Sequence, residues 1–119
     1  FTHKNRASKV AVADSFSVGF TSDTLDNQHL WNLNSGKLTA PLKHQQRWMS
    51  ISAARFSANE KRLLIASPSG AISIWNPING ENIAQWNTDF PVVDVAENKS
   101  GDLVSVGSTG LVEIWKRQW

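Results

Sequence analysis

The chain has 119 residues, which is enough for one domain and too few for two. Its formal net charge is only +2, from 12 basic and 10 acidic residues scattered along the sequence, so we expect no nucleic-acid partner. The absence of cysteine excludes disulfides and thiolate metal sites and leaves the cellular compartment open. No apolar run is long enough for a membrane helix, so we expect no membrane insertion.

The first part of the chain, residues 1–43, predicts four short strands. We place them at residues 10–13, at 16–22, in a segment that ends at Trp31, and at 37–42. Residues 16–22 alternate apolar and polar side chains, which is the pattern of a half-buried strand. Pro41 cannot donate a backbone hydrogen bond, so the last of the four strands belongs at a sheet edge.

The remaining chain repeats this plan. Residues 44–88 predict strands at 51–57, 62–67, 71–76 and 82–87, and residues 89–119 predict strands at 92–97, 102–107 and 111–116. The linkers between them carry the proline, glycine and asparagine that turns favour. Two units therefore have four expected strands and the last has three, and we expect no helix.

Each unit contains a strand that ends in tryptophan, at Trp31, Trp75 and Trp115. A period of forty-odd residues with short strands resembles the WD40 repeat, in which one repeat is one four-stranded propeller blade. The resemblance implies an all-β, partial propeller of three antiparallel blades, 1–43, 44–88 and 89–119, the last lacking its outer strand. Since three blades cannot close a ring, we expect the C-terminal part of a larger propeller, with further repeats upstream of Phe1 and with open blade edges that favour self-association.

WD40 repeats often contain a hydrogen-bonded set: a histidine before the first strand, a serine or threonine on the second, an aspartate in the next turn and a tryptophan on the third. The resemblance implies a structural role for such residues, because they satisfy each other's buried polar atoms. Ser69 stands where the family prefers aspartate in the second unit. The residues at matching positions are His3, Trp31, His44, Ser67, Trp75 and Trp115.

Catalytic and metal-binding patterns are weak in this sequence. The three histidines lack the spacing of metal ligands, and no Gly-x-Ser-x-Gly nucleophile motif is present. In the propeller, the first strand of each blade would line the axis. The segments that we expect there are residues 10–13, 51–54 and 92–95, and they carry Asp94 as their only charged residue. That leaves little for general acid–base chemistry. We therefore expect no catalytic residue, no cofactor and no metal.

One connection suggests a binding role. Residues 45–50 form a longer link than the family usually has at this place, and they include Arg47 and Trp48, residue types that are enriched in binding hot spots. The alternative is that Trp48 packs over the blade as part of its core. We predict a non-catalytic scaffold that docks a protein or peptide on a loop face, or alternatively a fragment of a propeller hydrolase or oxidoreductase. The predicted partner-binding residues are Gln46, Arg47, Trp48 and Ser69.

Overall fold

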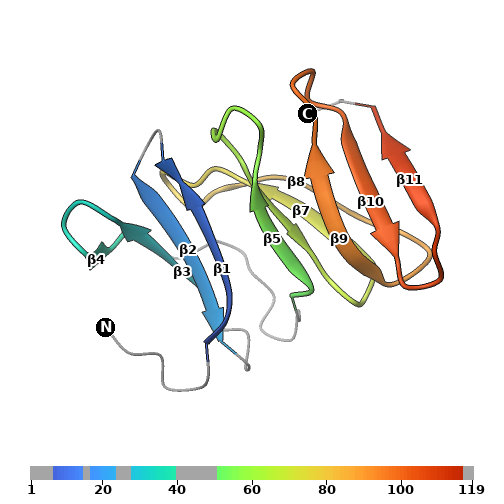
Figure 1. The fold of residues 1–119 in the computed structure, drawn as a ribbon, viewed down its shortest axis with the longest axis horizontal. Coiled ribbons are helices and arrows are strands. Elements are labelled where there is room, and N and C mark those ends of the chain that lie inside the picture. The colour runs from blue at the N-terminus through green and yellow to red at the C-terminus, as the bar shows by residue number, and fades with distance from the viewer. Residues whose placement is uncertain (1–6, 15–16, 24–27, 40–50, 117–119) are drawn as a thin grey trace.

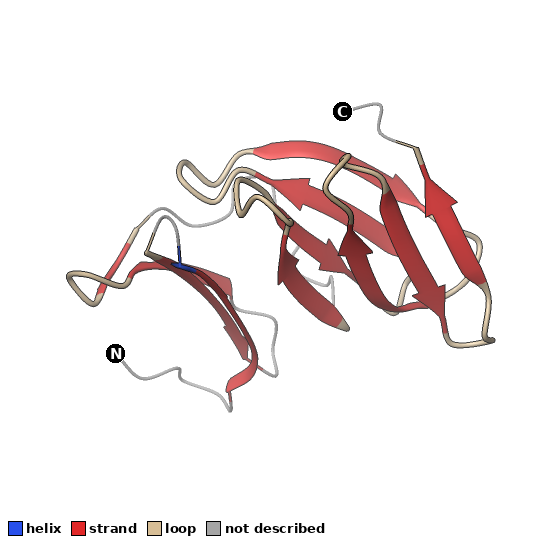
Figure 2. Cartoon of the chain, turned by 45° about the horizontal axis from the view of Figure 1, so that its top comes forward, coloured by secondary structure: helices blue, strands red, loops and turns tan. Residues whose placement is uncertain are grey.

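The computed structural model describes residues 7–14, 17–23, 28–39 and 51–116, and in this part of the chain it has eleven strands in three antiparallel sheets. Strands and loops make up these residues except for a single 3₁₀ position at Asp14 (Figure 2). The three sheets follow one another along the chain, and we call them blades 1, 2 and 3 (Figure 1). The fold is all-β, as the sequence predicted.

Each blade is an antiparallel meander in which strands that are consecutive in the chain are hydrogen-bonded neighbours. Blade 1 consists of β1 (Ala7–Ala13), β2 (Val18–Asp23), β3 (Gln28–Asn32) and β4 (Lys37–Leu38). Blade 2 consists of β5 (Ala53–Phe56), β6 (Leu63–Ala66), β7 (Ala71–Trp75) and β8 (Asn82–Asn87). Blade 3 consists of β9 (Val92–Glu97), β10 (Leu103–Gly107) and β11 (Val112–Trp115).

Two of the hairpins are closed by the same local chemistry. The side-chain carbonyl of Asn32 accepts hydrogen bonds from the next turn's backbone amides, those of Asn34 and Ser35. Asn76 does the same for Ile78 and Asn79 in blade 2. Asparagine favours this turn because its side chain imitates a backbone carbonyl. The repeated asparagine after the tryptophan strand therefore sets the turn into the outer strand of blades 1 and 2.

The hydrophobic core lies between blades rather than within any one of them. The inner strands β1, β5 and β9 lie side by side with the same direction, β5 in the middle (Figure 1), and the sheets pack against each other through their faces. As a result, every residue of β6 and β7 in the middle blade is buried. Sheets bury one face each when they have one neighbour, and both faces only when they lie between two neighbours.

Most predicted strands match the structure to within a few residues, and the differences affect the inner strands. The strand predicted at residues 10–13 begins at Ala7, and the strand predicted at residues 51–57 covers Ala53–Phe56. β1 therefore includes Lys9, while β5 includes Arg55 and β9 ends at Glu97, both just beyond the segments 51–54 and 92–95 that were expected to line the axis. The expectation that Asp94 is the only charged residue on the inner strands is therefore wrong. Strand limits depend on which backbone groups pair with the neighbouring strand, and hydropathy marks those limits loosely.

Candidate docking face

Loops from blades 2 and 3 gather at one end of the sheets. Because the strands alternate in direction, the starts of β5 and β9 and the β6–β7 and β10–β11 turns all lie at the lower end in Figure 1. We call this end the loop face and define it by residues 67–70, 88–91 and 107–111. The opposite end carries the β5–β6, β7–β8 and β9–β10 turns.

Five of the residues singled out from the sequence lie outside the described part of the chain. The remaining ones, Ser69 among them, can be placed. Ser69 is exposed on the loop face, in the turn between β6 and β7. The residues outside the described ranges are His3, His44, Gln46, Arg47 and Trp48.

The β6–β7 turn is held by a pair of serines. The hydroxyl of Ser67 is within 2.8 Å of the Ser69 hydroxyl, and it also accepts a hydrogen bond of 3.2 Å from the Ser69 backbone amide. Ser67 is buried, whereas Ser69 faces solvent. The pair thus satisfies a buried hydroxyl and fixes the turn that presents Ser69. Gly70 completes this turn with a φ of 99°, a conformation that glycine adopts without strain.

A second set of hydrogen bonds joins this turn to the connection between blades 2 and 3. The Thr88 backbone amide donates to the Gly70 carbonyl at 2.8 Å, and the Thr88 hydroxyl lies 3.0 Å from that carbonyl and 2.6 Å from the carbonyl of Phe90. The Val92 amide donates to the Ser67 carbonyl at 3.2 Å. Phe90 keeps 44% of its surface exposed on this braced segment. The loop face therefore presents an aromatic side chain on a support that both blades hold.

The three repeat tryptophans satisfy their indole groups in two different ways. The indole N–H of Trp31 donates to the Thr21 hydroxyl at 2.8 Å, and that of Trp115 donates to the Ser105 hydroxyl at 3.0 Å. In both cases the acceptor lies on the second strand of the same blade. Trp75 instead donates to Ser73 on its own strand, at 2.8 Å. Ser67, which the repeat pattern had matched to this set, bonds Ser69, and Trp75 bonds Ser73 in its place.

The strand register explains the exchange in blade 2. Residues Thr21 and Ser105 occupy the place that Ile65 takes in β6, because each lies opposite the residue two before the tryptophan. An isoleucine cannot accept a hydrogen bond, so Ser73 supplies the hydroxyl instead. In the sequence, the sign of this bond was Ser73 itself, the only polar residue in the otherwise apolar run 71–75. The tryptophans also differ in burial: Trp75 is 2% exposed, while Trp31 and Trp115 are half-buried.

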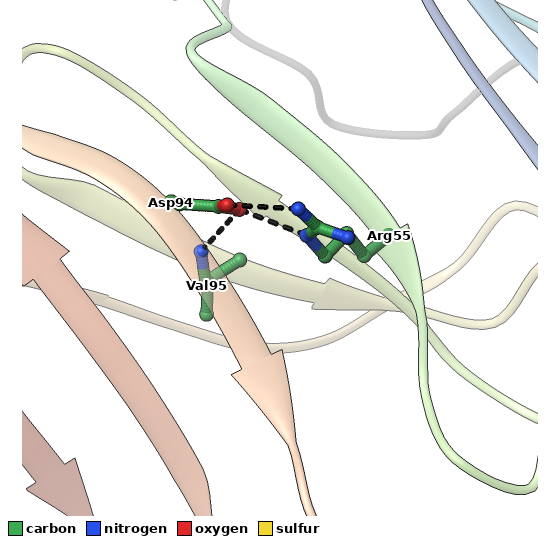
Figure 3. Close-up of polar contacts among 3 residues, drawn as sticks. All are labelled: Arg55, Asp94 and Val95. Carbon is green, nitrogen blue, oxygen red and sulfur yellow. Dashed lines mark hydrogen bonds and ion pairs between the residues drawn. The ribbon is translucent and has the colours of Figure 1, made fainter.

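On the inner strands, Arg55 and Asp94 form a two-pronged ion pair between blades 2 and 3 (Figure 3). The Arg55 Nε lies 2.9 Å from one carboxylate oxygen and Nη2 lies 2.8 Å from the other, and the Val95 amide donates to the carboxylate at 2.8 Å. The hydrogen bond from Arg55 is the main cause that lowers the pKa of Asp94, and Lys9 adds a smaller attraction. Asp94 is therefore a weakly basic carboxylate that links two blades.

A second link joins blades 1 and 2. The Glu60 carboxylate accepts a hydrogen bond of 2.7 Å from the Asp14 backbone amide. Beside it, an open groove of about 320 Å³ runs between β1 and β5 and is lined by residues such as Val12, Arg55 and Phe56. Within the described ranges, no group of three or more histidine, aspartate or glutamate side chains is placed to hold a metal ion. Nor does any helix in those ranges have the length and hydrophobicity to cross a membrane.

Comparison with known proteins adds information on the fold. No protein-family model matches the chain, and no curated protein matches its sequence. Among solved structures, the chain is similar to the RRP9 WD40 repeats, with 18% identity and a TM-score of 0.83 over 97% of this chain. It is also similar to two computationally designed proteins, Ika4 (18% identity, TM-score 0.77, 95% of this chain) and Ika8 (17% identity, TM-score 0.78, 97% of this chain).

These likenesses establish a WD40-like β-propeller fold for the chain. It spans 36% of the RRP9 structure and 34% of Ika8, and 67% of Ika4. The sequence prediction of a partial propeller with three antiparallel blades is confirmed, and among the described residues blade 3 has three strands where blades 1 and 2 have four. At such low sequence identity, the likeness concerns the fold and leaves activity and partners to be argued from the residues themselves.

Proposed function

We propose that the chain is part of a non-catalytic scaffold that docks a protein or peptide on its loop face, within a propeller of more than three blades. The observation that carries this proposal is the exposed Phe90 on its braced support. Aromatic side chains contribute strongly to protein interfaces, most of all when they need no ordering on binding. The hydrogen bonds of Thr88 to the carbonyls of Gly70 and Phe90 hold the backbone that carries this side chain.

The residues predicted from the sequence are near the loop face in chain order. The connection that contains Gln46, Arg47 and Trp48 leads into β5, which begins at the end where Ser69 is exposed. We therefore propose Arg47 and Trp48 as anchors of the partner, with Gln46 and Ser69 beside them. An extended peptide with acidic and apolar side chains would match an arginine and two aromatic residues.

The enzyme alternative has less support. Asp94, the carboxylate that could act as a base near the axis, is paired with Arg55, and this pairing lowers its pKa. A general base works best with a pKa near the working pH, so this carboxylate is poorly suited to proton abstraction. Hydrolytic or redox turnover by the intact protein that disappears in Asp94→Asn would favour the enzyme instead.

The scaffold proposal is tested by quantitative pull-down with the intact protein and three variants. Arg47→Ala/Trp48→Ala and Phe90→Ala change the proposed site. Lys61→Ala/Ile78→Ala is the matched control, because it removes one cation and one large apolar side chain from exposed turns at the opposite end of blade 2. Circular dichroism checks that each variant keeps its β structure.

We expect one or more partners that bind the wild type and the control equally and bind both site variants at least about tenfold more weakly. The binding would then be repeated with the purified partner to obtain dissociation constants. If the site variants fold and retain every partner, the named site is wrong. If the control loses the same partners, docking takes place at the opposite end of the blades.

A further inference from the structure

The two interfaces between blades are built from the same two kinds of sheet face. We call the side of each sheet that carries Trp31, Trp75 or Trp115 its tryptophan face, and the other side its opposite face. At the first interface, the opposite face of blade 1 packs on the tryptophan face of blade 2. The buried residues are Val18, Phe20 and Leu30 from blade 1 and Leu63, Ile65 and Trp75 from blade 2.

The second interface repeats this arrangement one blade later. The opposite face of blade 2 packs on the tryptophan face of blade 3. The residues in contact include Leu64, Ile72 and Ile74 from blade 2 and Val95, Leu103 and Trp115 from blade 3. The chain thus uses one type of contact twice, always an opposite face on the tryptophan face of the next blade.

One face of each kind remains uncovered in the described part of the chain. On the tryptophan face of blade 1, Val10 is 72% exposed and Val12 is 50% exposed. On the opposite face of blade 3, Val112 is 58% exposed and Ile114 is 66% exposed. Counted back from the tryptophan, these last two positions correspond to Ile72 and Ile74, which are completely buried in blade 2.

Two polar groups on these faces, the Trp31 indole and the Asp94 carboxylate, already have partners. The indole N–H of Trp31 already donates to Thr21, so covering this ring leaves no donor without a partner. Asp94, at the inner edge of the opposite face of blade 3, is already paired with Arg55. The two uncovered faces therefore combine apolar side chains with polar groups that have partners. The two interfaces that the chain buries between its own blades are also built from apolar side chains.

We propose that two copies of residues 1–119 cover these faces for each other, with blade 3 of each copy packed on the tryptophan face of blade 1 of the other. The contact is heterologous, because two different surfaces meet, and a two-fold arrangement contains it twice and closes on itself. Two copies of residues 1–119 joined in this way form a ring of six blades, which lies within the usual range of four to eight. Its faces are distinct from the loop face, so this pairing is independent of the docking proposed above.

Sedimentation equilibrium on the chain of residues 1–119 tests the proposal with two variants and a control. Ile114→Glu places a charge on the opposite face of blade 3, and Val10→Glu places one on the tryptophan face of blade 1. Both side chains are exposed in a single copy, so neither change disturbs its core. Ile78→Glu is the matched control, since Ile78 is 60% exposed in the β7–β8 turn, away from both faces.

We expect wild type and control to have a mass of twice 13.2 kDa, and each face variant alone to associate at least about tenfold more weakly. Mixing Ile114→Glu with Val10→Glu restores a one-to-one pair, because one of its two contacts then joins two unmodified faces. A monomeric wild type overturns the proposal, and so does a dimer that either variant leaves intact. An open polymer shows that the contact is real and that the two-fold closure is wrong.

Discussion

Blades 2 and 3 carry closely similar third strands in very different environments. The sequence Ala-Ile-Ser-Ile-Trp of residues 71–75 is buried throughout, whereas Leu-Val-Glu-Ile-Trp of residues 111–115 has exposed or half-buried side chains at every position. Both strands pair with the strand before them in the same register. What differs is the number of neighbouring blades that cover them. In a propeller, the stability contributed by a given residue therefore depends on the position of its blade.

The largest difference between the two blades is expected at the tryptophans. Trp75→Ala should lower the free energy of unfolding by about 3–5 kcal/mol, because it empties a site that is 2% exposed. Trp115→Ala should cost roughly 1–3 kcal/mol, since this ring is half-buried at the edge of the core between blades 2 and 3, where it also lies beside Trp86 with ring centroids 5.6 Å apart. Urea unfolding of both variants measures the two values. Equal losses would mean that the blades contribute alike.

The isoleucine before each tryptophan gives a sharper version of the comparison. Ile74→Ala should cost about 2–4 kcal/mol, because Ile74 is fully buried between blades 2 and 3. Ile114→Ala should change the stability of a single copy by less than about 0.5 kcal/mol, because Ile114 is 66% exposed. The measurement requires dilute protein, so that self-association adds nothing. A loss at Ile114 as large as at Ile74 would contradict its exposure.

The next largest difference in stability is expected at the glycines of the β6–β7 and β10–β11 turns. Gly70 and Gly110 have φ values of 99° and 88°, so alanine at either position strains the backbone by about 1 kcal/mol. At Gly70 an added Cβ would also lie 2.9 Å from the Thr88 carbonyl oxygen, while at Gly110 nothing lies within 4 Å. We expect Gly70→Ala to cost about 2–4 kcal/mol and Gly110→Ala about 1 kcal/mol in thermal unfolding. If Gly110→Ala cost more stability than Gly70→Ala, the hydrogen bonds between Gly70 and Thr88 would not be what holds the loop face.

The smallest effect concerns the ion pair that joins the two blades. Arg55 lowers the pKa of Asp94 from its ordinary value of 3.8 in the folded chain, so the pair stabilises the fold above that pH. This contribution is lost as the pH falls through the lowered pKa. Since both side chains are well exposed, Asp94→Asn should cost less than about 1 kcal/mol at pH 7, and this cost should shrink as the pH falls through the lowered pKa. Unfolding of both proteins at pH 7 and at a series of acidic pH values tests this, and a cost that does not shrink in acid would show that the ion pair is not its source.

The division into blades could be predicted from the sequence because its signals are local. Alternating hydropathy, turn residues and a tryptophan that recurs at Trp31, Trp75 and Trp115 all act within a few residues of one another. The strands Asn82–Asn87 and Val92–Glu97 were predicted at their observed limits. The candidate site was less accessible. Ser69 was placed in a turn, but the support that Thr88 gives to Phe90 joins residues 70, 88 and 90, which no local pattern connects.

The sequence by itself determined the strands, their order and the residues that face each way, since these follow from the two-residue period of a strand and from turn chemistry. Only the tertiary structure decided which faces are covered. It placed Arg55 opposite Asp94, moved the indole partner of blade 2 to Ser73, and buried Ile74 while leaving Ile114 exposed. The reason is physical. A side chain's direction is set by its own strand, whereas its burial and partners are set by a neighbouring blade whose register against it no single strand encodes.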